Sequence, residues 1–210
     1  MRIRLLPQAM VLGALTAALI TAGCHIQVDK GKNGEDKNVR VDTPLGGLHV
    51  RSDQTSAADL GLPVYPGAQI APDSEGDRSA DIHMGFGKWQ LRVKVVTYLT
   101  PDAQDKVLAF YKNALGRFGT VLQCDDGHAV GTPAVTSEGL SCRNDSHARV
   151  QWNDNGNGNT VDNDNGLSLR AGSVHNQHIV AFKTSSAGTK YSLVEVELPN
   201  GEDNSSKTSD

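Results

Sequence analysis

The segment WQLRVKVVTYL, residues 89–99, followed directly by TPDAQDKVLAFYKNALGRFG, residues 100–119, decides the fold class. In the first part apolar and polar residues alternate, so that Leu91, Val93 and Val95 share one face of a strand and polar side chains occupy the other. Such a strand can turn one face to a core and the other to water. We therefore expect a strand over 89–99, paired with a strand over 80–86 through the glycine-containing turn between them.

The second part has the pattern of one amphipathic helix. Thr100 suits the N-cap, Pro101 suits the first helical position, and Gly119 suits the C-terminal cap. Apolar residues recur at helical spacing and form one stripe, which consists of Val107, Phe110, Tyr111, Ala114, Leu115 and Phe118. We expect this stripe to pack on a sheet.

Strand patterns dominate the rest of the chain, with Gly188 at the turn before the last of them. Alternating or apolar runs predict strands over 120–124, 139–143, 148–153, 167–171, 178–183 and 191–198. One helix among many hairpin-linked strands indicates the α+β class, an antiparallel β-sheet with one main amphipathic helix packed on one face.

The composition divides the chain into four parts. Residues 1–23 have the pattern of a signal peptide, residues 24–58 that of a polar tether with a short hairpin or stalk at 39–51, residues 59–199 that of the α+β domain, and residues 200–210 that of a disordered tail. The tether prediction rests on the charged, glycine-containing sequence HIQVDKGKNGEDKN, which has little to bury.

The N-terminal residues have the layout of a secretory signal peptide. A basic start is followed by an apolar run and then by Thr21-Ala-Gly-Cys24. This pattern resembles the lipobox of bacterial lipoproteins. The resemblance implies that Cys24 is the mature N-terminus and carries a diacylglycerol and a further acyl chain such as palmitate, so that the protein binds the membrane through this anchor. Because His25 rather than Asp follows, it implies the outer membrane, facing the periplasm, in a cell with two membranes. Plain secretion is the alternative, since Leu is commonest at the position of Thr21.

Two further cysteines, Cys124 and Cys142, form an even pair in a chain predicted to be exported. This favours one disulfide bond between them. A zinc site or a dithiol redox site is the alternative, but zinc sites usually have paired Cys-x-x-Cys spacing and redox sites have closer cysteines.

The charge balance indicates no nucleic-acid partner. The chain has a formal net charge of −4 and no cluster of Lys and Arg. Tight binding to a phosphate backbone requires such a cluster.

Several short motifs resemble a family of uncharacterised exported bacterial envelope proteins. They cover about residues 39–198 and comprise Tyr65-Pro-Gly-Ala68, Thr97-Tyr98, Thr100-Pro-Asp102, Lys106-Val107, Phe110-Tyr-Lys112, Gly139-Leu-Ser-Cys142, Ala171-Gly172, Gln177-His-Ile-Val180 and Gly188-Thr189. The resemblance implies an envelope protein and brings no catalytic residue with it.

The segment NDNGNGNTVDNDNG, residues 153–166, is rich in oxygen-bearing side chains and glycine. Calcium binds six to eight oxygens, often around a turn that contains glycine. The candidate ligands are Asn153, Asn155, Asn157, Asp162 and Asp164. The segment lacks the Asp that usually opens such a loop and the bidentate Glu that usually closes it. We therefore expect an exposed loop without a high-affinity ion, with a weak calcium-binding module as the alternative.

The sequence contains none of the motifs Gly-x-Ser-x-Gly, Ser-x-x-Lys and His-Glu-x-x-His. His175 and His178 have ligand-like spacing but precede a strand without an adjacent carboxylate, and His128 and His147 flank the predicted disulfide loop. We expect no catalytic residue and no cofactor. The sequence favours a non-catalytic binding or scaffold module for an envelope protein or glycan, with an envelope hydrolase built from scattered residues as the alternative.

The aromatic residues mostly fit the apolar faces of the predicted elements, so we expect them in the core. They are Trp89, Tyr98, Phe110, Tyr111, Phe118 and Trp152. Tyr65 lies in an extended segment between prolines, and we expect it to pack on the sheet rather than face a partner.

Overall fold

The computed structural model describes residues 24–30, 36–52, 54–71, 79–142, 166–185 and 187–199. The elements in chain order are β1 (His25–Lys30), β2 (Asp36–Thr43), β3 (Gly46–Ser52), the 3-10 helix η1 (Ala57–Leu60), β4 (Gln69–Ile70), β5 (Ser79–Phe86), β6 (Trp89–Thr100), α2 (Gln104–Leu115), the 3-10 helix η3 (Gly116–Phe118), β7 (Leu122–Asp125), β8 (His128–Ala129), β9 (Ser168–Gly172), β10 (Asn176–Ser185) and β11 (Gly188–Glu197).

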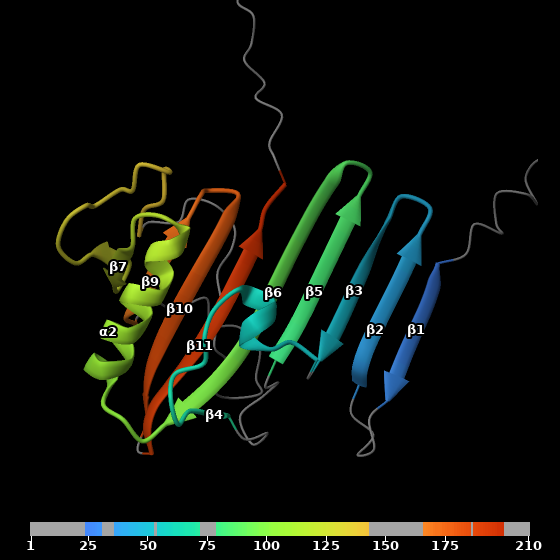
Figure 1. The fold of residues 1–210 in the computed structure, drawn as a ribbon. Helices are drawn as coiled ribbons and strands as arrows, with labels where there is room; N and C mark the ends of the chain where they lie inside the picture. The colour runs from blue at the N-terminus through green and yellow to red at the C-terminus, as the bar shows by residue number, and fades with distance from the viewer. Residues whose placement is uncertain are drawn as a thin grey trace, which may run out of the picture.

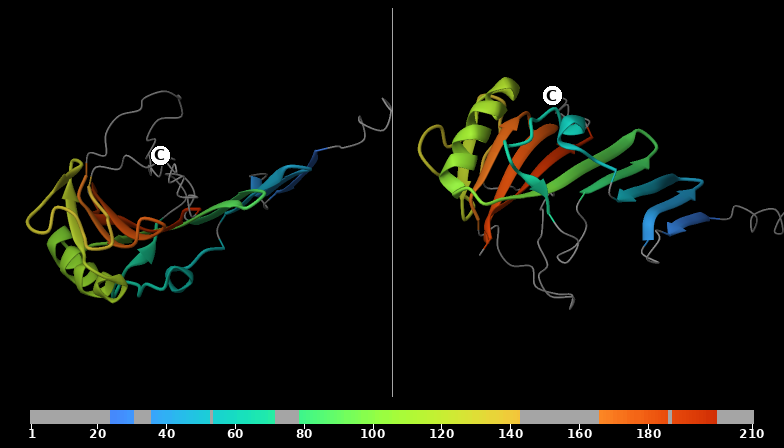
Figure 2. Two further views of the ribbon diagram at one scale, coloured as in Figure 1. Left: turned by 90° about the horizontal axis from the view of Figure 1, so that it is seen from above. Right: turned by 60° about the horizontal axis from the view of Figure 1, so that its bottom comes forward.

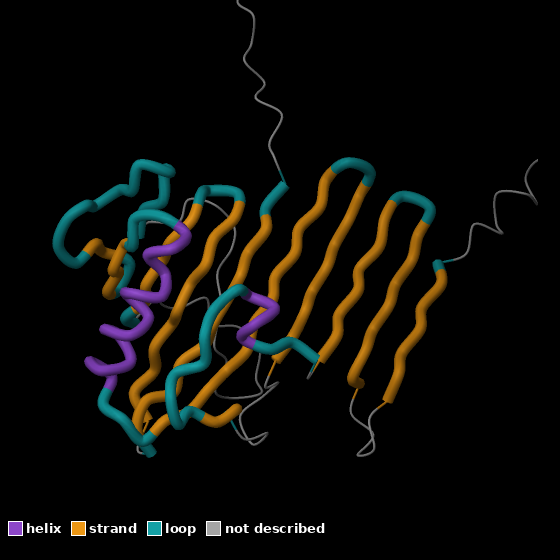
Figure 3. Tube along the Cα trace, viewed as in Figure 1, coloured by secondary structure: helices purple, strands orange, loops and turns teal. Residues whose placement is uncertain are grey.

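These strands form one large antiparallel sheet (Figure 1). The order across the sheet is β1-β2-β3-β5-β6-β11-β10-β9-β7-β8, and the short strand β4 pairs with β6. The helix α2 packs on β9, β10 and β11, toward one lateral edge of the sheet. The described residues outside the helices are mostly strand (Figure 3). The prediction of an antiparallel sheet with one main helix is confirmed, but the sheet dominates and the fold is mostly β.

The strand that leads into the helix runs further than the sequence predicts. The strands predicted over 80–86 and 89–99 are confirmed as β5 and β6, which join at the Phe86–Trp89 pair. Because Thr100 pairs with Thr189 of β11, it belongs to β6 and does not cap the helix. The N-cap of α2 is Ala103, and Gly119 follows η3 rather than α2 itself.

The main core lies between α2, the segment around η1 and one face of β6, β11, β10 and β9 (Figure 2). The face of α2 that carries Val107, Tyr111 and Leu115 is buried against these strands. The buried strand residues of this cluster are Val96, Tyr98, Leu169, Ala171, Val180, Phe182, Tyr191 and Leu193. A second, smaller cluster formed by Ile179, Val194 and Val196 lies on the opposite face of the sheet.

Four of the later strand predictions are confirmed and one is wrong. The runs 120–124, 167–171, 178–183 and 191–198 correspond to β7, β9, β10 and β11. Residues 139–143 form no strand among the described residues, since Ser141 makes only an isolated bridge to Val135. Gly139 has a φ of 85°, which interrupts an extended backbone there. The run predicted over 148–153 lies outside the described residues.

The tether predicted for residues 24–58 differs from the structure. His25 to Lys30 form β1, which pairs with β2. The expected hairpin at 39–51 is present as β2 and β3, and β3 pairs with β5. The boundary predicted at residue 59 is therefore crossed by the sheet. Composition gave the wrong prediction because polar side chains do not prevent backbone pairing at a sheet edge, and in β1 both faces and the outer side of the strand remain in water.

The sheet thus has two regions, which differ in what covers them (Figure 2). The covered part consists of β6, β11, β10 and β9, over which α2 and the segment around η1 pack, together with β7, which pairs with β9. The extension consists of β1, β2, β3 and β5, and it projects beyond the helix as a single layer in the part of the chain that the structure describes.

Candidate functional site

The face of the sheet that carries α2 becomes polar where the helix ends. Across neighbouring strands, the register places Arg51, Asp81, Lys94, Glu195 and His178 in one row. Side chains in one row across a sheet point to the same face. Charges of alternating sign therefore lie side by side from the extension to the covered part.

A hollow of about 240 Å³ lies on this polar face. Asp81 accepts two hydrogen bonds from the Arg92 guanidinium, at 3.0 Å from Nε and 2.7 Å from Nη2. This interaction holds the pKa of the Asp81 carboxyl below its usual range. The hollow is lined by Arg51, Gln54, Thr55, Asp59, Asp81, Arg92 and Lys94.

Lys94 closes the inner end of this hollow. Its Nζ donates to Glu195 Oε2 at 2.7 Å and to the backbone oxygen of Asp59 at 3.1 Å. Both side chains of the ion pair are largely buried. A buried ion pair that is also hydrogen-bonded has a defined geometry, because moving either charge leaves the other without compensation. The inner wall of the hollow is therefore rigid.

A second hollow of about 220 Å³ adjoins the first and shares Arg51 and Gln54 with it. Its wall includes Arg40 and His49, which hydrogen-bond to the Asp42 carboxylate at 2.6 Å and 3.1 Å. These contacts lower the pKa of Asp42. We call the two hollows together the polar groove. The polar groove runs from β1 to β6. It presents carboxylates, some of them ion-paired with neighbouring cations, as well as guanidinium and amide groups.

The candidate histidines do not form a site. His178 is buried and stacks on the Phe118 ring, with 3.6 Å between the ring centroids. Burial lowers the pKa of His178, and the charge of Glu195 opposes this effect. His175 is exposed, and His128 bonds through Nδ1 to the backbone oxygen of Asp126 at 2.8 Å. His147 lies outside the described residues. Among the described residues, no group of three or more His, Cys, Asp and Glu side chains could hold a metal ion.

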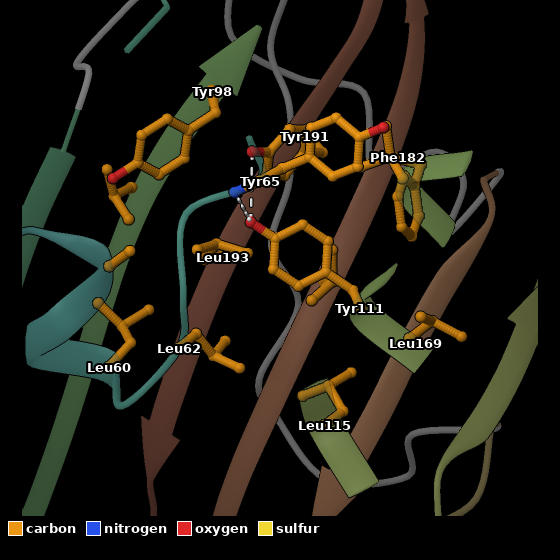
Figure 4. Close-up of a cluster of buried hydrophobic side chains, with 14 of the residues drawn as sticks. Leu60, Leu62, Tyr65, Tyr98, Tyr111, Leu115, Leu169, Phe182, Tyr191 and Leu193 are labelled. Carbon is orange, nitrogen blue, oxygen red and sulfur yellow. Dashed lines mark hydrogen bonds between the residues drawn. The ribbon is translucent and has the colours of Figure 1, made fainter. Parts of the chain in front are cut away.

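Tyr65 packs on the sheet, as the sequence predicts. Its ring is buried, and its hydroxyl donates to Asp102 Oδ2 at 2.7 Å. The Tyr111 hydroxyl accepts from the Tyr65 backbone nitrogen at 3.2 Å and lies 3.2 Å from the Tyr191 hydroxyl (Figure 4). These tyrosines join the segment after η1 to α2 and β11, so their role is to hold the core together.

The disulfide between Cys124 and Cys142 is present, and both cysteines are buried with Leu122. Cys124 lies in β7, but Cys142 follows the isolated bridge rather than lying in a neighbouring strand. The bond therefore fastens the loop that follows β8 to the edge of the sheet.

The prediction that Trp89 lies in the core is wrong. Trp89 is 42% exposed and Phe86 51% exposed at the β5–β6 turn. Both belong to the face opposite α2, where the register forms apolar rows such as Val50, Ile82, Val93 and Val196. The alternation in β6 correctly predicts which face these residues share. The alternation does not show whether another element packs on that face, and none of the described helices covers it where Phe86 and Trp89 lie.

The remaining candidates fall on parts that the structure does not describe. The residues proposed as calcium ligands, Asn153, Asn155, Asn157, Asp162 and Asp164, lie there, as do Trp152 and the predicted signal peptide 1–23. Cys24 is described and is an exposed free cysteine. No helix among the described residues has the length and apolar character needed to span a membrane.

Comparisons of the chain with models of protein families, with curated proteins and with solved structures found no match.

Proposed function

We propose that this protein is a lipid-anchored protein of the cell envelope that acts as a non-catalytic binding module. Its anchor is Cys24, and its ligand surface is the polar groove. In a cell with two membranes it belongs to the outer membrane and faces the periplasm. Its partner is an envelope protein or a glycan, and neither nucleic acid nor a cofactor takes part.

The observation that carries the binding role is the construction of the polar groove. Its charged groups form defined pairs, Arg92 with Asp81 and Lys94 with Glu195, so the donors and acceptors along its floor hold fixed positions. Arg51 lies exposed where the two hollows meet and acts on Asp81 through its charge. A ligand with several hydroxyl, amide or carboxylate groups can exchange its water for such an array.

The anchor has support of a different kind. The sequence before Cys24 has the lipoprotein pattern, and the thiol of Cys24 is exposed directly before β1. Acyl chains contribute about 0.8 kcal/mol for each buried methylene group, so several chains on one residue anchor a protein firmly. Detergent-phase partitioning and mass spectrometry of the mature protein test the anchor. Recovery in the aqueous phase with an unmodified Cys24 would refute it.

The groove is tested by site-specific photocrosslinking in intact cells. A photoreactive residue at Gln54, which lines both hollows, should give a discrete adduct, and the same residue at the exposed Ser137 should not. Arg51→Glu should reduce the Gln54 adduct severalfold, because it reverses the charge where the hollows meet. Lys112→Glu, an equal charge reversal on the exposed side of α2, is the control. Adducts of equal yield from Gln54 and Ser137 would exclude the groove as the ligand surface.

A further inference from the structure

Large apolar side chains are exposed at the end of the extension where β1 begins, directly after Cys24. Ile26 is 64% exposed, Leu45 82%, Phe86 51% and Trp89 42%. The beginning of β1, the β2–β3 turn and the β5–β6 turn all lie at the same end of the sheet (Figure 1). We call these four residues the apolar edge.

The register fixes how these residues lie relative to one another. Ile26 pairs with Val41 in β2, two residues before Thr43, and Thr43 pairs with Gly46 at the turn that holds Leu45. Gly46 in turn pairs with Phe86, and Phe86 pairs with Trp89. The apolar edge therefore lies within the last three rows at this end of the strands rather than being scattered over the surface of the sheet.

The two aromatic rings in this edge lie next to each other, and the Phe86 ring lies next to Gly46. The rings of Phe86 and Trp89 are 6.0 Å apart. The Phe86 ring lies over Gly46, where a Cβ atom would come within 2.5 Å of its Cδ1 atom. The absence of a side chain at Gly46 therefore leaves the space that the ring occupies. Both rings lie at this end of the sheet with much of their surface in water.

The chemistry of this edge is that of a membrane interface. Trp combines a large apolar ring with a polar N–H group, and Trp is enriched where acyl chains meet headgroups. Lys88 lies in the turn between the two aromatic residues and is exposed. Its long side chain can keep the charge among the headgroups while its methylene groups lie along apolar surface.

The position of Cys24 indicates which apolar phase the edge meets. β1 begins at His25, so no spacer separates Cys24 from the sheet. At about 3.3 Å for each residue, Ile26 lies within roughly 7 Å of Cys24. Strands lie about 4.8 Å apart, so the four steps from β1 to β6 make the edge roughly 19 Å long. Acyl chains on Cys24 would bring one corner to the bilayer, and the rest of the edge would lie along its surface.

We propose that the apolar edge, formed by Ile26, Leu45, Phe86 and Trp89, is a membrane-contact surface that lies in the headgroup region of the bilayer beside the acyl chains of Cys24. This inference rests on the proposed function, because the anchor brings the edge to the membrane. It adds a fixed orientation, in which the strands stand on the membrane by this end. The opposite end of β6, where β4 pairs with it, then faces away from the bilayer.

The test places a single tryptophan in the mature protein, either at the start of β6 or in β4, which pairs with the other end of β6. In the Trp152→Phe variant, Trp89 is the only tryptophan. In the control variant, Trp152→Phe and Trp89→Phe are combined with Ile70→Trp. Ile70 is 52% exposed and pairs with Tyr98 at the other end of β6. Each protein is reconstituted into vesicles of phosphatidylethanolamine and phosphatidylglycerol, with or without lipids brominated near the carbonyl end of their acyl chains.

We expect the brominated lipids to reduce the Trp89 emission by about twofold or more, because a tryptophan at the interface lies within reach of the bromine atoms. The tryptophan emission of the Ile70→Trp control should not change. Equal emission from Trp89 with and without bromine would overturn the proposal, and so would equal quenching in both variants. A Trp89 emission that shifts with protein concentration and is not quenched by bromine would also overturn it, because a second copy of the chain would then cover the edge.

Mass spectrometry of the same preparations separates this inference from the proposed function. If Cys24 carries acyl chains and Trp89 is not quenched, the anchor stands and the membrane-contact surface fails. If Cys24 is unmodified and Trp89 is still quenched, the edge binds membranes by itself and the proposed anchor fails.

Discussion

The covered part and the extension are built from strands with the same alternating pattern, yet their side chains have different surroundings. In the covered part, Leu169, Val180 and Leu193 are fully buried beneath α2. In the extension, Ile26 and Val28 of β1 are large apolar residues in water. Alternation along a strand therefore tells which residues share a face, whereas burial depends on whether another element packs on that face.

The largest expected effect compares a leucine in each region. Leu169→Ala should lower the free energy of unfolding by about 2–5 kcal/mol, because it removes methyl groups from a filled core and leaves a cavity. Leu48→Ala in β3 should lower it by only about 1 kcal/mol, because Leu48 is half-buried in the extension. Urea denaturation followed by far-ultraviolet circular dichroism measures both. Equal losses would contradict the distinction between the two regions.

The second effect concerns the disulfide at the edge of the covered part. Cys124 and Cys142 are 18 residues apart, and reduction of a bond that closes a loop of this size should cost about 3 kcal/mol. Since the bond fastens the loop after β8 to β7, amide hydrogen exchange should increase in β7 and β9 far more than in β2 and β3. A uniform increase in exchange over all strands would mean that the two regions unfold as one cooperative unit.

The sequence predicts the strands well because alternation depends on neighbouring residues. It predicts the limits of the elements less well, because these depend on partners distant in the chain. Thr100 has the features of an N-cap, but its pairing with Thr189 keeps it in the sheet. Residues 25–30 have the composition of a tether, but β2 offers them a free edge. In both cases a backbone partner outweighs the local preference.

The candidate site shows the same limit more strongly. The disulfide follows from a count of cysteines, and the packing of Tyr65 follows from its prolines. The polar groove could not be predicted, since the register brings Arg51, Asp81, Lys94 and Glu195 together from four strands. Each of these residues has only the pattern of a solvent-exposed charge in the sequence. The apolar edge could not be predicted for a related reason, because an apolar pattern does not show which part of the face another element buries.

A smaller effect than that of the disulfide is expected from His178, which lies in β10 of the covered part. Burial lowers the pKa of this imidazole below its ordinary value of 6.5, so the unfolded chain takes up a proton before the folded protein does. The contribution of the neutral His178 to the free energy of unfolding is therefore complete above pH 6.5 and is lost as the pH falls below that value. His178→Gln should make stability less dependent on pH in this range, measured by urea denaturation at several pH values. The control is Asn176→Gln, which changes an exposed residue of the same strand and removes no titratable group.

The smallest effect is expected at Leu45, the most exposed of the large apolar residues in the extension. In the lipid-free protein, Leu45→Ser should change the free energy of unfolding by less than about 0.5 kcal/mol, because folding removes little of the Leu45 side chain from water. Ile70→Ser, at the other end of the sheet, is the matched control. A clear loss of stability for Leu45→Ser alone would show that Leu45 packs against something in solution. If that loss grew with protein concentration, a second copy of the chain would cover the extension. The difference in burial between the covered part and the extension would then hold only for the monomer.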